Sequence, residues 1–202
     1  MTIAAPLAKN ALAWLQDGIA MPTTLYEAGT WRVPGGVIFP TDPLGLWQAF
    51  EEPGIRVPTD AARIVGLLEE SQDRTAILAF IWSHAPVFGG DDVCTIASVC
   101  GLAGFLTPED VDAVQTYGDP EGTPYHGMYK DQLDAKLPTP PTLVSLPAGN
   151  RFPISGSGWG NGKYPVASLT DADGTMLALY TQFIGGGENW LLPPVREDKG
   201  PT

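Results

Sequence analysis

The chain has 202 residues, with 23 acidic against 11 basic side chains and a formal net charge of −12 at neutral pH. This acidic balance argues against a nucleic-acid-binding protein, which needs clustered Lys and Arg, and no apolar run is long enough to predict a transmembrane helix. The hydrophobic content of 44% argues against disorder, while 24 glycines and 20 prolines predict short strands and long loops rather than a helical bundle.

We expect one domain over residues 1–202, because a chain of this length can bury about 70% of its unfolded surface around one core. The predicted fold class is α+β and β-dominated: an antiparallel, sandwich-like or rolled sheet with two or three peripheral helices. The N-terminus lacks a positively charged start followed by a continuous apolar stretch, and two cysteines do not indicate a disulfide scaffold. These features predict a cytoplasmic protein.

The first predicted elements are a helix and two strands. The N-terminal segment 1–20 is expected to be helical, because the apolar residues of 5–17 share one face of a helix. Two short strands are predicted within 29–40, on either side of the Pro-Gly-Gly turn at 34–36, and Pro40 is expected to close the second strand.

Residues 59–70 form a segment with helical spacing of its apolar residues behind a possible Thr59 N-cap, which favours a helix. The next segment, 75–82, is nearly all apolar. Such a run predicts a central strand that is buried on both faces.

A second helix is predicted after Thr107, which can cap it, with Pro108 in the first helical position and two acidic residues in the first turn. This helix should end before Gly118. Residues 128–137 are expected to form a short polar helix, and the last residues, 193–202, an extended tail.

The most informative segment begins with a glycine-rich turn at 157–162. A strand is predicted over 163–169, a two-residue Asp-Gly hairpin turn at 173–174, and a strand with period-2 alternation over 176–183. Glycines on both sides of Trp159 permit a close approach, so the favoured interpretation is a structural hairpin in which this indole folds flat against the protein. A ligand site at the turn is the alternative. Phosphate binding is disfavoured because the Walker spacing is absent and no helix is predicted to follow.

The run SGWGNGKYPVASLTDADGTMLALYTQF (157–183) resembles the C-terminal signature of the bacterial domain of unknown function 4241 family. Upstream, GTWRVPGG (29–36) and DPL (42–44) are similar to that family's N-terminal element. CGLAGF (100–105) falls where the family carries an Asp-Ala-Gly-x-Gly-Cys-Phe stretch, from which this chain departs at the Asp and Cys positions.

The resemblance covers most of residues 29–185 and implies a β-dominated bacterial domain without an established activity, so it assigns no catalytic residue. It also implies a different structure for the ambiguous segment 59–70. There, 63–68 and 75–83 would be the arms of a hairpin about a polar turn, and we favour this hairpin over the helix.

A cysteine–histidine pair is the catalytic arrangement to weigh: Cys94 or Cys100 with His84 or His126, assisted by Asp91 or Asp92. The small apolar context of Cys100 is typical of an inert buried thiol, so a Cys/His-dependent hydrolase is the less favoured alternative. No HxH, HExxH or CxxC spacing indicates a metal site, and the Asp-x-Asp-Gly run at 171–174 lacks the further ligand positions of a calcium loop. We expect no metal and no cofactor.

Aromatic residues in loops are the remaining signal, because Tyr and Trp supply rigid contact area at recognition surfaces. The candidate binding residues are Trp159, Asn161, Tyr164, Tyr125, Tyr129 and Trp190. The leading hypothesis is a non-catalytic binding protein with another protein as its partner, such as an immunity protein that neutralises a basic bacterial toxin. The alternative is a structural or assembly subunit with ordered Pro/Gly-rich arms. Neither nucleic acid nor membrane is an expected partner.

Overall fold

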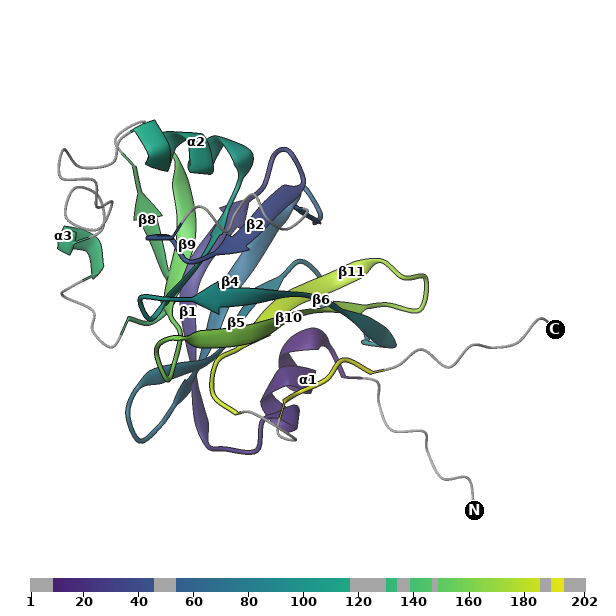
Figure 1. Cartoon of the computed structure of the whole chain (residues 1–202). Coiled ribbons are helices and arrows are strands. Elements are labelled where there is room, and N and C mark those ends of the chain that lie inside the picture. The colour runs from purple at the N-terminus through teal and green to yellow at the C-terminus, as the bar shows by residue number, and fades with distance from the viewer. Residues whose placement is uncertain are drawn as a thin grey trace, which may run out of the picture.

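Two antiparallel β-sheets face each other in the computed structural model of the chain (Figure 1), which describes residues 9–45, 54–116, 130–133, 139–146, 149–185 and 190–194. The six-stranded sheet has the order β1-β4-β5-β11-β10-β6, formed by Thr23–Arg32 (β1), Ala61–Glu69 (β4), Arg74–Ile81 (β5), Met176–Gln182 (β11), Gly162–Thr170 (β10) and Gly89–Ser98 (β6). The five-stranded sheet has the order β3-β2-β7-β9-β8, formed by Ile55–Arg56 (β3), Val37–Thr41 (β2), Leu102–Leu106 (β7), Arg151–Gly156 (β9) and Thr142–Ser145 (β8). The described helices are Ala11–Gly18 (α1), Pro108–Thr116 (α2) and Lys130–Leu133 (α3). The predicted β-dominated α+β class, sandwich-like with peripheral helices, is confirmed.

The main core fills the space between the two sheets. Phe80 of β5 and Phe105 of β7 meet there edge to face, with ring centroids 4.7 Å apart, and both side chains are fully buried. Trp31 of β1 packs on Phe80 from the same side of its sheet. Because these contacts join strands of different sheets, they fix how the two sheets lie against each other.

A second core covers the outer face of the six-stranded sheet. Along β5, Leu78 and Phe80 belong to the inner core, whereas Ile77 and Ala79 belong to the outer one. The helix α1 covers this outer face with Leu15 and other apolar side chains, on the side away from the five-stranded sheet (Figure 1). A strand covered on both faces is apolar at every position, which explains the continuous apolar run predicted as a central strand.

The segment 59–70 is a strand, so the hairpin interpretation is confirmed and the helical one is wrong. Strands β4 and β5 pair antiparallel from Arg63 opposite Ile81 to Glu69 opposite Arg74, and β5 is the third of six strands. The helical spacing was misleading because β4, like β5, is buried on both of its faces. A strand buried on one face has an apolar residue at every second position, whereas β4 has apolar residues on both faces. The extra apolar positions happened to match the spacing of a helix.

The helices α1 and α2 lie where the sequence predicted them, and each begins at a side-chain cap. Asn10 caps α1 by accepting the amide of Ala13, and the helix includes Gly18, while 5–8 of the predicted helix lie outside the described residues. The predicted start of α2 is confirmed by a reciprocal cap: the Thr107 hydroxyl accepts the Asp110 amide at 3.2 Å. The Asp110 carboxylate in turn accepts the Thr107 amide at 2.9 Å.

Smaller corrections concern chain ends and turns. The helix α3 lies inside the predicted segment 128–137, whose other residues are outside the described part, as are 195–202 of the expected tail. The strands predicted within 29–40 exist, but they belong to different sheets, and β2 runs through Pro40 to Thr41. Pro40 is tolerated because β3 pairs only with the first two residues of β2, which leaves a neighbouring strand on one side alone.

The turn between β10 and β11 is longer than the predicted two-residue hairpin. Thr170 is opposite Met176, so five residues form the loop, with Gly174 at φ 87°. The Asp171 carboxylate accepts the amides of Asp173 at 3.0 Å and Thr175 at 2.8 Å, so this aspartate builds the turn with its own side chain. None of the helices in the described part of the chain is long and apolar enough to cross a membrane.

Candidate binding site at the junction of the two sheets

The chain crosses between the sheets twice at one place, through 99–101 from β6 to β7 and through 157–161 from β9 to β10. We call these two turns the sheet junction. They are bonded to each other, because the Ser157 amide donates to the Gly101 carbonyl at 2.9 Å. The hydroxyls of Ser98 and Ser157 also lie 3.2 Å apart in the interior. The junction is therefore part of the rigid body of the protein.

Two glycines give the 157–161 turn its shape. Gly158 has φ 59°, and a Cβ there would lie 2.8 Å from Cγ1 of Ile184 and 3.0 Å from the Thr75 carbonyl oxygen. Gly160 has φ 96°, and its carbonyl oxygen accepts the hydroxyls of Ser157 at 2.6 Å and Tyr164 at 2.7 Å. Only glycine fits the first position, because the backbone itself packs against the body of the protein there.

Trp159 points outward between these glycines, and 55% of its surface is exposed. The expectation that its indole folds into the protein as a structural staple is therefore wrong. The close approach that the glycines permit is made by the backbone of Gly158, which turns the intervening side chain to the surface. The Arg74 guanidinium lies 5.1 Å from the centre of the indole ring and donates to the Gly158 carbonyl at 3.4 Å. This cation–π contact favours the orientation in which the exposed ring is found.

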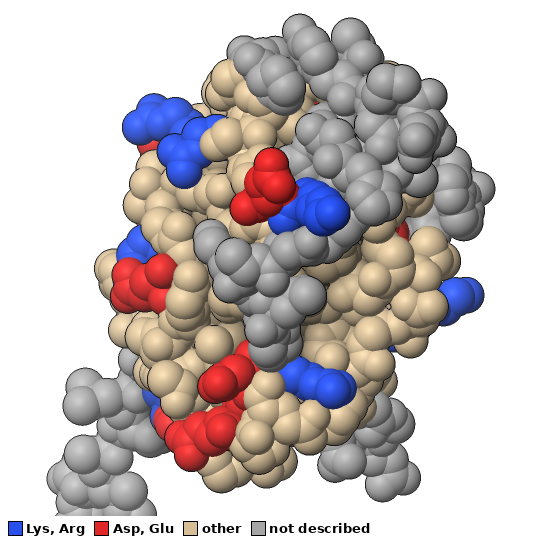
Figure 2. Space-filling model, turned by 90° about the vertical axis from the view of Figure 1, so that its left-hand side faces the viewer, with Lys and Arg blue, Asp and Glu red and all other residues tan. Residues whose placement is uncertain are grey.

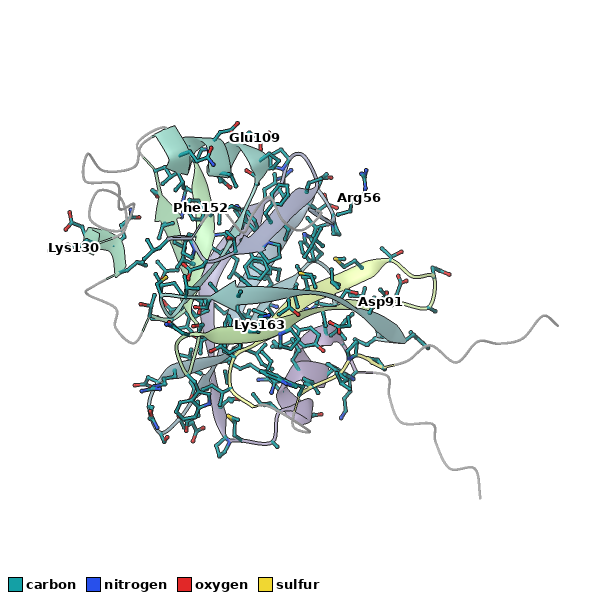
Figure 3. All side chains as sticks on the ribbon, viewed as in Figure 1. Arg56, Asp91, Glu109, Lys130, Phe152 and Lys163 are labelled. Atoms are coloured by element: carbon teal, nitrogen blue, oxygen red, sulfur yellow. The ribbon has the colours of Figure 1, made fainter. Side chains whose placement is uncertain are left out.

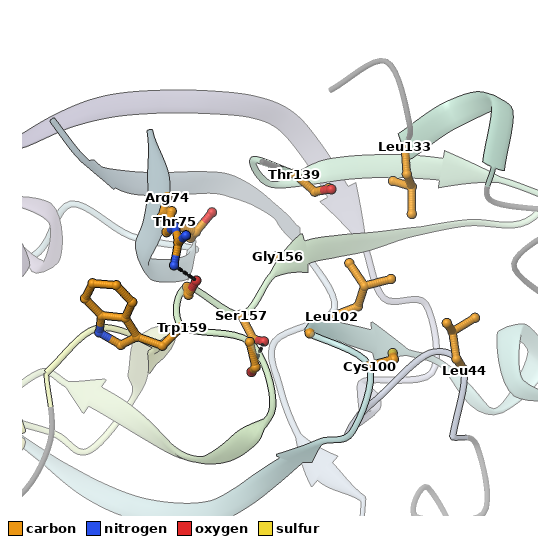
Figure 4. Close-up of a pocket in the computed structure, with 13 residues that line it drawn as sticks. Leu44, Arg74, Thr75, Cys100, Leu102, Leu133, Thr139, Gly156, Ser157 and Trp159 are labelled. Atoms are coloured by element: carbon orange, nitrogen blue, oxygen red, sulfur yellow. Dashed lines mark hydrogen bonds between the residues drawn. The ribbon is translucent and has the colours of Figure 1, made fainter. Parts of the chain in front are cut away.

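A cavity of about 590 Å³ opens beside Trp159 (Figure 4). Figure 4 shows Arg74 and Trp159 on one side of it and the leucines on the other. The lining residues are Leu44, Arg74, Thr75, Cys100, Gly101, Leu102, Leu133, Thr139, Gly156, Ser157, Gly158, Trp159 and Gly160. Its walls thus combine an apolar surface, one cationic side chain and three hydroxyls, which is the composition typical of a small ligand site.

Asp42 anchors the other side of the junction. Its fully buried carboxylate accepts the amides of Val99 at 2.7 Å, Cys100 at 2.9 Å and Leu44 at 2.9 Å. The Cys100 thiol donates to the same carboxylate at 2.7 Å. Three of these four hydrogen bonds join the segment that carries Leu44 to the turn that carries Cys100, and the fourth, from the Leu44 amide, orders that segment itself. Together they fix one wall of the cavity.

Cys100 differs from the inert buried thiol that its sequence context predicted. The residue is exposed, and its thiol is turned toward Asp42. Burial of the sulfur, the hydrogen bond to Asp42 and the negative charge of that carboxylate raise the pKa of Cys100 to about 12. A thiol with this pKa is protonated at neutral pH and is a poor nucleophile. Its partner is a carboxylate rather than the histidine that a hydrolase would need, and His126 lies outside the described residues.

A second hollow of about 390 Å³ lies elsewhere, along β6. Asp91, Asp92 and Cys94 line it together with Arg56 of β3, and Figure 3 shows Arg56 and Asp91 at this end of the sandwich. The aspartates considered as helpers of a catalytic cysteine are therefore near Cys94 and do not line the cavity at the junction. Within the described residues, no group of three or more His, Cys, Asp and Glu side chains is arranged to hold a metal ion.

The six predicted binding residues do not lie together in the structure. Trp159, Asn161 and Tyr164 lie in or beside one turn, but Tyr164 is buried, and burial raises the pKa of its hydroxyl, so it supports the turn from below. Asn161 is exposed but does not line the cavity. Trp190 is partly buried against the inner core. Tyr125 and Tyr129 lie outside the described residues.

The residue that sequence reasoning missed is Arg74. It begins β5 and reaches Trp159 from another strand, in a contact between segments 84 positions apart at the Gly158 carbonyl. The sequence gives no local pattern for such a contact. The sequence did indicate where Arg74 would lie. A basic residue at the start of an otherwise apolar strand is expected to place its side chain at the rim of the core.

Charge on this side of the molecule is mixed. Figure 2 views the side that is on the left in Figure 1, and its coloured residues show small acidic groups interspersed with basic ones, without a continuous field of one sign. The net charge of −12 is therefore not gathered into one patch over the described part of this face. It acts at long range, whereas contact specificity depends on individual side chains.

Comparison of the chain with protein-family models, with curated proteins and with solved structures found no match. The resemblance to the bacterial domain of unknown function 4241 family therefore stays a prediction from the residues that carry it.

Proposed function

We propose that this chain is a non-catalytic, cytoplasmic binding protein that recognises another protein through the sheet junction. The observation that carries the proposal is Trp159, a tryptophan that is 55% exposed on a turn held by hydrogen bonds at both ends. Val99, on the neighbouring turn of the junction, is 52% exposed. Exposed Trp next to Arg is the composition typical of the residues that dominate binding energy in protein interfaces.

Rigidity supports the same function. The indole is held by Arg74, and the turn beneath it by the Gly160 carbonyl, so the binding surface exists before a partner arrives. A surface that is already ordered loses little conformational entropy on association.

The charge of the chain favours a basic partner. A net charge of −12 accelerates the encounter with a positively charged protein, and this steering weakens as salt rises. The most concrete form of the proposal is an immunity protein that binds and neutralises a basic bacterial toxin, in line with the bacterial family that the sequence resembles.

The test is capture of a partner from the native host by the immobilised full chain at low and at high salt. We expect a stable basic protein in the low-salt eluate, with less of it as salt rises, and we expect Trp159→Ala to remove it. Failure to capture any protein at low salt would contradict the proposal. Size-exclusion chromatography of the purified chain covers the alternative, because a stable homo-oligomer would favour a structural or assembly subunit.

A further inference from the structure

We infer that the cavity at the sheet junction binds an apolar carboxylate, whose charged end pairs with Arg74 while its apolar body contacts Leu44, Leu102 and Leu133. The inference rests on the proposed function, since it names the chemistry that a partner would place in this site. Two sources offer that chemistry: a free medium-chain acid, or the C-terminal residue of a partner polypeptide.

The size of the cavity sets the scale of the ligand. Its volume of about 590 Å³ lies within the range of small-molecule sites and suits a medium-chain acid or one or two amino-acid residues. The cavity is open to solvent next to Trp159 on the surface, so a chain end from outside can enter it.

Arg74 provides the charge for an anion. Its guanidinium group has five N–H donors, and one of them is bonded to the Gly158 carbonyl. The ion pairs within the described residues are Lys9–Asp17 and Arg63–Glu27, and Arg74 takes part in neither. Glu69, which is opposite Arg74 in the β4–β5 pair, has its carboxylate bonded to the Ser71 amide instead. The hydrogen bonds from Ser71 lower the pKa of Glu69, and the positive charge of Arg74 adds to this effect, so this carboxylate lies within electrostatic reach of the guanidinium without forming an ion pair with it. A ligand carboxylate in the cavity would be the first group to form an ion pair with Arg74 at contact distance among the described residues.

The hydroxyls of the cavity wall limit the ligand to a mainly apolar one. The Ser157 hydroxyl is bonded to the Gly160 carbonyl, and the Thr75 hydroxyl accepts that of Ser155. The Thr139 hydroxyl oxygen is buried in the wall and has no hydrogen-bond partner within the described part of the chain. A sugar or other polyhydroxyl ligand would therefore find few unused polar groups, and a polyphosphate would find a single basic residue. A cationic ligand would be repelled by Arg74.

The first experiment titrates the full chain with octanoate and, as the matched uncharged probe, with 1-octanol, followed by isothermal calorimetry and by the amide NMR signals of Gly101, Gly158 and Gly160. We expect octanoate to bind and to shift these signals. Arg74→Gln should lower the affinity for octanoate at least about tenfold, because it removes the positive charge and the paired N–H donors of the guanidinium. Arg74→Lys should lose less of the affinity for octanoate, because it keeps the charge. Arg56→Gln, in the other hollow, should leave this affinity unchanged.

The second arm distinguishes the two sources with an apolar tripeptide, Leu-Leu-Leu, carrying either a free carboxylate or a C-terminal amide. Binding of the free form only would identify a chain terminus as a ligand; binding of octanoate alone would identify a free acid. The inference would be overturned if neither octanoate nor the free tripeptide bound. It would also be overturned if 1-octanol bound as tightly as octanoate, or if folded Arg74→Gln bound octanoate as tightly as the wild type. Partner capture that depends on Trp159 while neither carboxylate binds would overturn the inference alone and leave the proposed function standing.

Discussion

Asp42 and Cys100 are joined twice: one carboxylate oxygen accepts the Cys100 backbone amide at 2.9 Å, and the other accepts its thiol at 2.7 Å. The same carboxylate accepts two further amides, those of Leu44 and Val99. One buried acidic side chain thus orders both segments at this side of the junction. The consequence is that the Leu44 wall of the cavity and the 99–101 turn depend on one side chain, although that turn lies 57 or more positions away from Asp42 in sequence.

Replacement of Asp42 by Ala should destabilise the protein by about 2 kcal/mol or more, because it leaves three partly buried amides without their acceptor, and an unpaired donor costs about 1–3 kcal/mol when it is fully buried and less when water reaches it. Denaturant unfolding followed by circular dichroism measures this. The control is Asp60→Ala at an exposed position, which should change stability by less than about 0.5 kcal/mol. Equal midpoints for the two variants would show that the Asp42 network does not hold the junction.

Alkylation should show that Cys100 is unreactive despite its exposure. With a pKa of about 12, only about one thiol in ten thousand is ionised at pH 8, so reaction with iodoacetamide should be far slower than for a free cysteine. The measurement uses a Cys94→Ser background, so that Cys100 is the thiol that reacts. A rate at pH 8 equal to that of an unfolded control would mean that the thiol is not held by Asp42.

The same thiol makes the folded state sensitive to alkali. The pKa of Cys100 is raised in the folded protein from an ordinary value of 9.0 to about 12, so the unfolded chain loses this proton first as pH rises. The stabilising contribution is therefore complete below about pH 9 and is lost between about pH 9 and 12. Unfolding midpoints measured across this range should fall less steeply for Cys100→Ala than for the wild type, and parallel curves would contradict the assignment.

Gly158 and Gly160 should respond differently to alanine. Both have positive φ, which costs a non-glycine residue about 1–2 kcal/mol. At Gly158 a Cβ would also lie 2.8 Å from Ile184, whereas at Gly160 it would meet no atom within 4 Å. Chemical denaturation should thus find Gly158→Ala clearly the more destabilised of the two. The reverse order would mean that the turn does not pack against Ile184.

Local patterns account for much of what the sequence could predict. The cap at Thr107 and Asp110 and the apolar run of β5 each depend on neighbouring residues. The hairpin of β4 and β5 was instead predicted from the family resemblance, against a local spacing that favoured a helix. The junction does not depend on neighbouring residues, since Asp42 meets Cys100 across 58 positions. The outward direction of Trp159 could not be predicted either, because flanking glycines indicate a close approach without indicating which atoms make it.

The most direct test of the proposed function compares Trp159→Ala with Phe88→Ala in affinity for the captured partner. Phe88 is the matched control because it is also aromatic and is 56% exposed, against 55% for Trp159. We predict that Trp159→Ala lowers the affinity for the partner by at least about tenfold, equivalent to about 1.4 kcal/mol of binding free energy. The unfolding midpoint of this variant should stay near that of the wild type. Phe88→Ala should keep full affinity. Undiminished partner affinity in Trp159→Ala would contradict recognition through the sheet junction.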